Sequence, residues 1–270
     1  MILLLDIGGT TTRVSSATKT GALLPVQHFP TEPDAAAGIA RIAHASRAVL
    51  ERRSLKAIVA GIAGQVSKEG VLLRGPNLPG WEGKNIRELF EKEFSVPSFV
   101  VNDAVLGGMG EAHAGAGKGA HSLLYMTLGT GIGVSRIIDG VPDFSIGTET
   151  GHQFLIVDGV PTEAENLVSG KAIRKRYGKP GEEIHDPAIW KECARYAALT
   201  LHNTMLFLLP DKIVIGGSLV KDGSLPVEDI ELRLAELSRN PRALPEVAHG
   251  TLGESAGLHG AQAYARIVLK

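Results

Sequence analysis

The feature that most constrains this chain is a repeated unit of strand, glycine turn and strand. It occurs first as LLLDIGGTTTRVSS near the start of the chain and again as LLYMTLGTGIGVSR from residue 123. In each copy a short apolar run, typical of a buried strand, ends in closely spaced glycines and is followed by a second β-rich run. The two copies lie about half a chain apart and indicate two structurally related halves, although they are too degenerate to prove a duplication.

Strand and helix patterns alternate around these copies, which favours an α/β fold. Asp34 is a plausible N-cap for a helix that follows it. Further strands are expected at 10–18, 22–29, 56–64, 96–103 and 211–218, and helices at 34–53, 83–94, 104–113, 163–177, 188–209, 227–237 and 254–269. No low-complexity linker separates the halves, so we expect two lobes that touch and share a cleft.

The composition excludes several classes of protein. The formal net charge of -1 gives no general attraction to nucleic acid or to an anionic membrane surface. The single cysteine, Cys193, excludes a disulfide framework and a cysteine-based zinc cluster, and its helical context favours a small core residue. The apolar N-terminus breaks at Asp6 without a basic n-region, and no apolar run reaches membrane-spanning length. The expected location is the cytoplasm.

The two glycine turns are candidate phosphate sites, because glycine lets backbone N–H groups approach phosphate oxygens. In the first turn Asp6 is also a candidate Mg²⁺ ligand, directly or through water. The alternative for this motif alone is a plain junction between strand and turn. The second turn is neither a Walker A loop nor a good dinucleotide fingerprint, since a strand follows it where a helix should begin. The phosphate-binding candidates are Gly8, Gly9, Thr10, Thr11 and Thr12 in the first turn, and Gly129, Thr130 and Gly131 in the second.

Asn102 and Asp103 stand where a predicted strand ends and a helix begins. A carboxylate there can accept the proton of a hydroxyl that attacks phosphorus. An Asn-Asp pair at this junction is also a good helix cap, and on the dipeptide alone the cap is favoured. The phosphate turns on either side in the sequence shift the balance toward a catalytic base.

Polar residues in GTETGHQF and EAENLVSG are candidate sugar contacts. Carboxylates accept hydrogen bonds from neighbouring hydroxyls, and imidazole can donate or accept. The candidates are Glu149, His152 and Glu165. The alternatives are a solvated first helical turn for Glu163 and Glu165, and a hydrogen-bonded core histidine for His152. A strand that ends in Gly216 and Gly217 offers a weaker place for an adenine or ribose.

Taken in order, these elements resemble the ROK family of the actin-like/hexokinase/Hsp70 superfamily, over nearly the whole chain. The resemblance implies an actin-like ATPase (ribonuclease H-like) fold with two lobes, each a mixed five-stranded sheet flanked by helices. The expected lobes are 1–113, with the C-terminal helix 254–270 packed back on it, and 114–253. It also implies that Asp103 is the catalytic base and that Asn102, Glu149, His152 and Glu165 contact sugar. Asn77 in GPNLPGW and Gly64 in GIAGQV occupy further substrate-contacting regions.

Two departures from the family pattern stand out. Many members carry a cysteine-rich loop that binds zinc together with the histidine that corresponds to His152. Here that loop is shortened and has no cysteine. A structural zinc site needs about four ligands, so we predict no zinc. The second departure is Thr11, which stands where lysine is common and removes a cation near the phosphates.

The resemblance predicts an ATP- and Mg²⁺-dependent hexokinase or glucokinase that phosphorylates a hexose, with the 6-hydroxyl as the expected acceptor. N-acetylmannosamine, N-acetylglucosamine and fructose remain alternative substrates, and polyphosphate remains an alternative donor, although the intact Ser169-Gly170 segment favours ATP. A catalytically silent sugar-binding regulator is a further alternative. Regulator members carry an N-terminal helix-turn-helix, whereas this sequence starts on the phosphate strand. A homodimer is a common expectation for the family that nothing in the composition tests.

Overall fold

The computed structural model describes residues 1–146, 149–221, 224–238 and 244–269. The chain divides into two compact units. The first comprises Met1–His113 together with Ser255–Lys270, and the second comprises Ala114–Glu254. Each unit has its own five-stranded mixed sheet and its own hydrophobic core.

The first sheet has the order β3-β2-β1-β4-β7. Its strands are β1 (Ile2–Ile7), β2 (Thr11–Ala17), β3 (Gln27–Pro30), β4 (Ala57–Ile62) and β7 (Ser98–Asn102). β1 is central, antiparallel to β2 and parallel to β4, and β7 continues the parallel side. The parallel register aligns Ile7, Ile62 and Asn102, so the strand ends that precede the candidate residues meet at one edge of the sheet.

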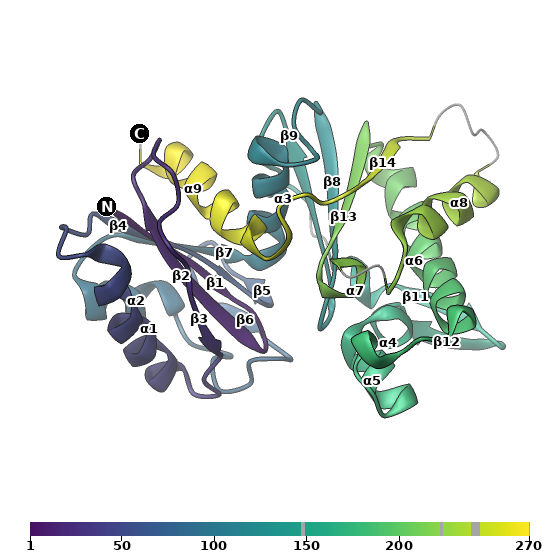
Figure 1. Ribbon diagram of the computed structural model, residues 1–270, viewed down its shortest axis with the longest axis horizontal. Helices are drawn as coiled ribbons and strands as arrows, with labels where there is room; N and C mark the ends of the chain where they lie inside the picture. Colours follow the sequence, from purple (N-terminus) through teal and green to yellow (C-terminus); the bar gives the residue numbers. More distant parts are fainter. Residues whose placement is uncertain (147–148, 222–223, 239–243, 270) are drawn as a thin grey trace. The chain divides into compact units, whose positions relative to one another are not determined.

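Helices cover both faces of this first sheet (Figure 1). α1 (Ala35–Leu50) and α2 (Ile86–Phe94) pack on one face. Their core includes Leu3, Leu5 and Ile7, the alternate residues of β1. On the other side α9 (Ala256–Val268) contacts β1 and β4. A short hairpin of β5 (Gln65–Val66) and β6 (Leu72–Arg74) completes the unit.

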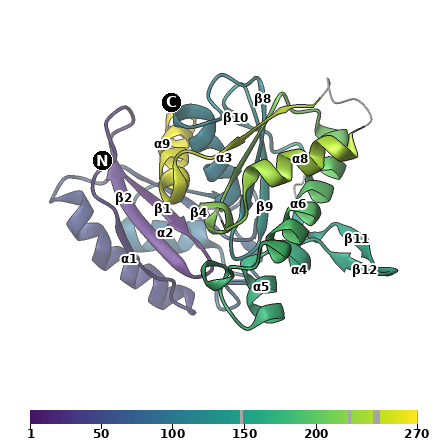
Figure 2. The same ribbon diagram turned by 45° about the vertical axis from the view of Figure 1, so that its right-hand side comes forward.

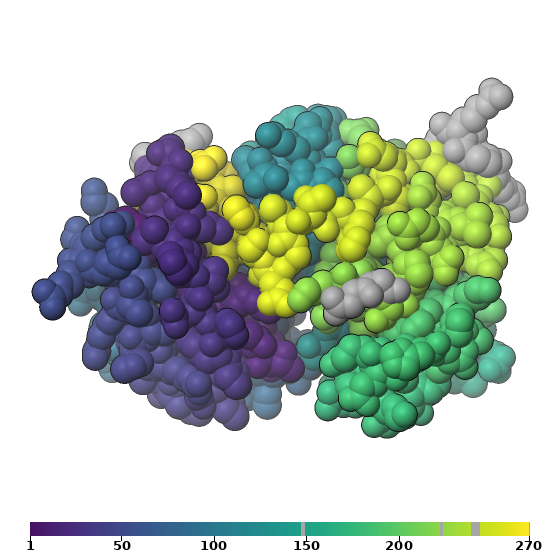
Figure 3. Space-filling model, in the orientation of Figure 1, coloured from purple at the N-terminus to yellow at the C-terminus, as the bar shows by residue number. Residues whose placement is uncertain are grey.

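The C-terminal helix joins the N-terminal strands within the first unit. Gln262 donates from Nε2 to the carbonyl of Thr18 at 2.9 Å, and Arg266 donates from Nε to the carbonyl of Lys19 at 2.7 Å. Figure 3 shows the yellow C-terminal residues against the purple N-terminal segment. Glycine allows α9 to pack closely on α3 (Asp103–Ala114), because a Cβ at Gly260 would collide with the backbone of Leu106.

The second sheet repeats the arrangement of the first, with the order β10-β9-β8-β13-β14. Its strands are β8 (Ser122–Leu128), β9 (Ile132–Ile138), β10 (Val141–Pro142), β13 (Lys212–Gly216) and β14 (Glu246–His249). β8 is again central, antiparallel to β9 and parallel to β13. The hairpin between β9 and β10 turns at Asp139-Gly140, both with positive φ, as that dipeptide predicts.

Helices α6 (Pro187–Leu208) and α8 (Val227–Leu237) pack on each other in the second unit and are visible together in Figure 2. Shorter helices are α4 (Glu165–Val168), α5 (Gly170–Tyr177) and α7 (Ser218–Lys221). A hairpin of β11 (Phe154–Val157) and β12 (Val160–Glu163) precedes α4. None of the helices described is both long and apolar enough to cross a membrane.

The structure corrects three expected boundaries. The helix expected over 163–177 is two helices that are interrupted at Ser169, whose φ and ψ of -118° and 160° are extended. Ser169 instead caps α5, since its hydroxyl oxygen accepts from the N–H of Ala172 at 3.1 Å. The strand expected over 22–29 covers only Gln27–Pro30, and α1 ends at Leu50 before Glu51 turns left-handed. The Asp34 N-cap is confirmed, because its carboxylate accepts from the N–H groups of Ala36 and Ala37.

Candidate active site

The first glycine turn is held by bonds within the turn and by Thr31. The N–H of Gly8 donates to the carbonyl of Thr11 at 3.0 Å, and the hydroxyl of Thr31 donates to the carbonyl of Gly8 at 2.8 Å. Thr12 is only 1% exposed, and its hydroxyl lies 2.9 Å from that of Thr31. Thr10 is exposed, so within this turn it is Thr10 and not Thr12 that presents its side chain to solvent.

Asn77 lies directly against the first turn. A Cβ at Gly9 would come within 2.5 Å of the Cβ of Asn77, which is closer than real Cβ atoms approach other atoms. The structure therefore brings Asn77 and Gly9 together, although they lie far apart in the sequence. Glycine at position 9 has a packing reason as well as any ligand-binding one.

Asp6 is a mostly buried carboxylate at the end of β1, with 17% of its side chain exposed. The β1–β2 register places it opposite Arg13, whose Nη1 lies 3.6 Å from Oδ2 of Asp6. Burial, and after it the charge of Asp103, raise the pKa of Asp6 to about 7, while Arg13 opposes the shift. A Cβ at Gly257 would lie 3.0 Å from the Asp6 carboxyl carbon, so the start of α9 closes over this group.

Asn102 acts as the helix cap at the end of β7. Its Oδ1 accepts from the N–H of Ala104 at 2.9 Å and from that of Val105 at 3.3 Å. Its Nδ2 donates to the carbonyl of Gly64 at 2.9 Å. Gly64 has a φ of 126° and no room for a Cβ beside Arg74. The cap interpretation of the Asn-Asp pair is thus met by Asn102, which also ties β7 to the loop after β4.

Asp103 follows as the first residue of α3. Its Oδ1 accepts a hydrogen bond from the N–H of Ala104 at 2.9 Å. Burial raises the pKa of Asp103 to about 6, although hydrogen bonds from the backbone N–H groups of Ala104 and of Asp103 itself oppose the shift. A carboxyl group with this pKa is largely ionised at neutral pH and still basic enough to accept a proton.

The second glycine turn is bound by residues that follow it in the chain. The N–H of Gly129 donates to the carbonyl of Gly131 at 3.0 Å, and the N–H of Gly170 donates to the carbonyl of Gly129 at 2.8 Å. Gly129 itself is open, since a Cβ there would meet only the hydroxyl of Ser218 at 3.8 Å. Its φ is not left-handed, so neither packing nor backbone conformation requires glycine at this position.

Glu165 is the first residue of α4, so the alternative placed it in a first helical turn correctly, but its carboxylate bonds to the second glycine turn instead of being free in solvent. Its Oε2 accepts from the N–H of Ile132 at 2.9 Å. A Cβ at Gly131 would come within 2.5 Å of the same oxygen. The turn and this carboxylate are therefore fitted to each other across 33 residues of sequence.

His152 ends a 3₁₀ helix, Thr150–His152, and lies between two carboxylates. Its Nδ1 is 3.2 Å from Oε2 of Glu163, and its Nε2 is 3.7 Å from Oε2 of Glu149. Glu163 belongs to β12 and not to a first helical turn, so the expectation of a solvated helical residue was wrong there too. The structure brings together Glu149 and His152, the two predicted sugar residues, and adds Glu163.

Gly216 and Gly217 have packing reasons of their own. A Cβ at Gly216 would come within 2.8 Å of the Tyr125 hydroxyl. Gly217 has a φ of 99° and lies against the backbone of Leu128 at the start of the second turn. The end of β13 is therefore packed beside the second glycine turn within one unit.

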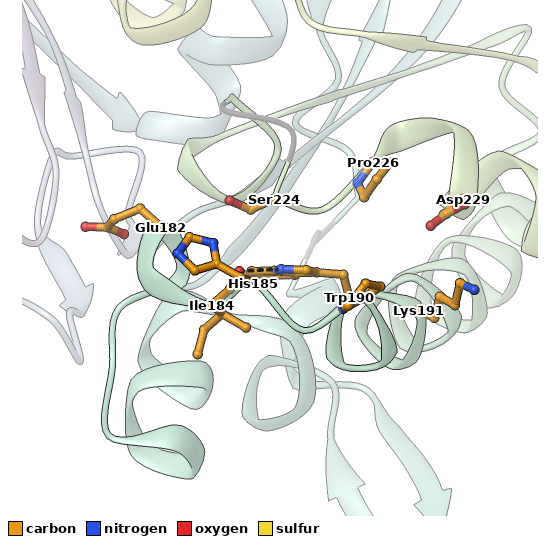
Figure 4. Close-up of a pocket in the computed structure, with 9 residues that line it drawn as sticks. Glu182, Ile184, His185, Trp190, Lys191, Ser224, Pro226 and Asp229 are labelled. Atoms are coloured by element: carbon orange, nitrogen blue, oxygen red, sulfur yellow. Dashed lines mark hydrogen bonds between the residues drawn. The ribbon is translucent and has the colours of Figure 1, made fainter.

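A pocket of about 450 Å³ opens in the same unit (Figure 4). Its lining combines an indole with polar groups from α6, α8 and the segments before them: Glu182, Ile184, His185, Pro187, Trp190, Lys191, Ser224, Pro226 and Asp229. The indole N–H of Trp190 donates to the carbonyl of Ile184 at 3.0 Å, which fixes the ring. Gly181 lies between this region and α7, because a Cβ there would meet Leu219 at 3.0 Å and Trp190 at 3.3 Å.

The family model of the ROK family matches residues 2–267. The chain belongs to the ROK family. An uncharacterized protein of Clostridium perfringens is 30% identical over 290 residues, which cover 97% of this chain and 96% of that protein. A glucokinase of Streptomyces coelicolor is 27% identical over 306 residues, with 97% and 96% covered.

Among solved structures, a ROK glucokinase of Streptomyces griseus in complex with glucose and AMPPNP superposes with a TM-score of 0.84. It is 25% identical in sequence, and the match covers 98% of this chain and 99% of that chain. The predicted actin-like, two-lobed α/β fold is confirmed. ROK membership places the chain with sugar kinases, which are phosphotransferases.

The donor set suits the Mg²⁺ that ROK kinases imply. Mg²⁺ usually keeps several waters and takes one or two protein carboxylates together with phosphate oxygens. Asp6 provides one such carboxylate, and the charge of Asp103 acts on it. Among the residues that the structure describes, no cluster of three or more His, Cys, Asp or Glu side chains is arranged to hold a metal ion. The prediction of a zinc-free ROK protein stays a prediction.

Three residues of this ROK chain were missed from the sequence. Arg13 could have been found from the strand pattern. Two strands joined by a tight turn pair in a defined register, and that register places Arg13 opposite Asp6. Glu163 was assigned to a helix, and only the β11–β12 hairpin brings it to His152. Thr31, the residue that follows β3, bonds to the first turn, and no local sequence pattern identifies it.

Proposed function

We propose that this chain is an ATP-dependent hexokinase, with glucose as the first substrate to test, that transfers the γ-phosphoryl group to the 6-hydroxyl of a hexose. The observation that carries the proposal is Asp103, a partly buried carboxyl group at the start of α3, whose pKa is raised to about 6. Asn102 caps the helix with its own side chain, so Asp103 is available for another role. The glucokinase relatives support a hexose as acceptor.

Asp103 would accept the proton of the sugar hydroxyl as that oxygen bonds to phosphorus. In a loose phosphoryl-transfer transition state the proton leaves late, so the base mainly has to be oriented and ionised. The bond from the N–H of Ala104 to Oδ1 provides the orientation. Bound Mg²⁺ would neutralise charge on the phosphates, with Asp6 as its protein ligand, directly or through water.

The nucleotide would be held by backbone N–H groups of the glycine turns. In the first unit the N–H of Gly9 would donate, with hydroxyls from Thr10 and Thr11, while Gly8 shapes the turn through its bond to Thr11 and Thr12 supports it from inside. In the second unit the N–H groups of Thr130 and Gly131 would donate, and Gly129, whose own N–H bonds to Gly131, would let the phosphate approach. The openness of Gly129 supports this role, since glycine there is otherwise unexplained. Gly216 and Gly217, which pack beside the second turn, would receive the adenosine part.

The sugar would be bound by acceptors that match its hydroxyls. In the second unit Glu149 and His152 lie within 3.7 Å of each other and form one such pair. Glu165 would contribute the carboxylate oxygen that does not bind Ile132. In the first unit Asn77 lies against the first glycine turn, and Asn102 bonds to Gly64 beside the start of α3, where Asp103 lies. These three residues would add further sugar contacts.

A panel of acceptors and donors tests the proposal. ADP release is measured with glucose, mannose, fructose, N-acetylglucosamine and N-acetylmannosamine, and phosphorylated sugar is measured with ATP and with polyphosphate. We expect the highest kcat/KM for glucose with ATP. A preference for fructose or an N-acetylated sugar would replace the substrate, and a preference for polyphosphate would replace the donor. Sugar binding without turnover under any condition would show a silent regulator instead.

A further inference from the structure

His152 is held by the hairpin that follows it, and the hairpin is firmly anchored. The register of β11 and β12 pairs Phe154 with Glu163, and the N–H of Ala164 donates to the carbonyl of Gln153 at 2.9 Å. These contacts bring the end of β12 beside His152. Leu155, between the exposed Phe154 and Ile156, points into the core and is 6% exposed.

Gln153 fixes the start of the hairpin to α6. Its Nε2 donates to the carbonyl of Thr200 at 3.2 Å and lies 3.3 Å from the hydroxyl of Thr204. Its Oε1 accepts from Nδ2 of Asn203 at 3.0 Å. Because both neighbours of His152 in space, Gln153 and Glu163, belong to this braced segment, the imidazole has a defined position.

The two nitrogens of His152 have different surroundings. Nδ1 is 3.2 Å from the Glu163 carboxylate, which is within hydrogen-bond range, whereas Nε2 is 3.7 Å from Glu149, which is beyond it. An ionised carboxylate can only accept, so the bond to Glu163 requires the proton on Nδ1. In the neutral imidazole Nε2 is then an acceptor.

We infer that Glu163 is a positioning residue that fixes His152 as the Nδ1–H tautomer, so that Nε2 and the Glu149 carboxylate form a pair of acceptors for two adjacent sugar hydroxyls. The sugar half of this inference rests on the proposed function, and the tautomer half does not. Two hydrogen-bond acceptors 3.7 Å apart repel each other slightly, and this repulsion is relieved when each accepts a hydroxyl proton from the ligand. The pair therefore selects a vicinal diol and disfavours a ligand that has only one hydroxyl there.

NMR of the ligand-free protein tests the tautomer directly. Long-range ¹H–¹⁵N spectra of ¹⁵N-histidine-labelled protein distinguish Nδ1–H from Nε2–H imidazole, and His152→Asn identifies the signal among the nine histidines. We expect the Nδ1–H pattern in the wild type and its loss in Glu163→Leu. Glu163→Gln keeps an acceptor oxygen and should retain the pattern in part. An Nε2–H pattern in the wild type, or an unchanged pattern in Glu163→Leu, would overturn the inference.

Kinetics test the consequence for sugar binding. Glu163→Leu should raise KM for the sugar about tenfold, the effect of losing one ordinary hydrogen bond, while kcat changes little. Glu163→Gln should lie between this variant and the wild type. Glu231→Gln, an exposed residue of α8, is the matched control and should behave as the wild type. A fall in kcat with unchanged KM would contradict a positioning role. A wild type that phosphorylates no sugar would refute the proposed function and leave the tautomer result to decide on Glu163.

Discussion

The two glycine turns have the same backbone setting and different charged neighbours. Each follows the central strand of a five-stranded sheet, and in each sheet that strand is antiparallel to the next one and parallel to the strand on its other side. The last paired residues are Ile7 and Thr12 around the first turn and Leu128 and Ile132 around the second. The same local arrangement of strand, turn and strand therefore occurs twice in the chain.

The charges around the two turns differ. The first turn has Asp6 on its strand, whose pKa is about 7 because of burial and the charge of Asp103. The second turn has Thr127 at the comparable place on β8, opposite Gly133. Its nearby carboxylate, Glu165, comes from α4 and uses one oxygen on the N–H of Ile132.

The strands that lie two places from each central strand also differ. β7 in the first sheet leads into Asn102 and Asp103, whereas β14 in the second sheet ends at His249 and is followed by Gly250. In the first unit, burial raises the pKa values of two carboxyl groups, those of Asp6 and Asp103. If both turns hold phosphate as proposed, the acids with raised pKa values beside the first copy alone point to acid–base and metal chemistry there.

The largest effect should come from Asp103→Asn. Loss of a general base lowers kcat by about 10²–10⁴-fold. The asparagine keeps an oxygen that can accept from the N–H of Ala104, so the start of α3 should stay intact. Steady-state kinetics give kcat, and calorimetry should show sugar affinity within about twofold of the wild type.

Asp34→Asn is the matched control for this variant. Asp34 also starts a helix in the first unit, and its carboxylate only caps α1. Asparagine caps a helix as well as aspartate does, so kcat and stability should not change. If Asp103→Asn were as active as Asp34→Asn, Asp103 would be a second helix cap and the electrostatic contrast between the units would lose its catalytic meaning.

The sequence predicted most of the sheets and little of the contacts between distant segments. Buried strands that end in glycine carry a local signal, and so does the Asp34 cap. The break at Ser169 had only a short local signal, the Ser169-Gly170 dipeptide, which the helical pattern on both sides outweighed. It is fixed by a non-local bond from the N–H of Gly170 to the carbonyl of Gly129.

The site shows the same division between local and non-local information. Asn102 and Asp103 were found from a local junction, but which of the two caps the helix depends on Gly64, which is 38 residues away. The contact between Glu165 and Ile132, and that between Glu163 and His152, follow from the fold of the β11–β12 hairpin and α4. A single sequence gives no periodic pattern from which such pairs can be deduced.

Two substitutions in the second turn, Gly129→Ala and Gly131→Ala, should have smaller effects and should separate phosphate binding from packing. Gly129→Ala adds a Cβ into open space, so the melting temperature should stay within about 1 °C, yet KM for ATP should rise about tenfold if phosphate approaches this backbone. Gly131→Ala instead collides with Glu165 and should lower the melting temperature by several degrees, roughly 1–3 kcal/mol. Thermal melts and ATP titrations of both variants measure this. An unchanged KM in Gly129→Ala would remove the second turn from the phosphate site.

The smallest effect should appear in the part of the pH dependence of stability that Asp6 of the first unit contributes. Burial and the charge of Asp103 raise the pKa of Asp6 from 3.8 to about 7, so the folded protein binds this proton more tightly than the unfolded chain does. The stabilising contribution is therefore complete below pH 3.8 and is lost as pH rises through about 7. Asp6→Asn removes the ionisable group and should be more stable than the wild type near pH 8, with the gain shrinking as pH falls toward 4. Because the variant also loses the ion pair with Arg13, we expect a net gain of only about 1 kcal/mol, or 2–4 °C.

Thr127→Val, the comparable change in the second unit, should shift the melting temperature equally at all pH values. A wild type and an Asp6→Asn variant that melt in parallel from pH 4 to pH 8 would show that the first turn carries no more electrostatic strain than the second.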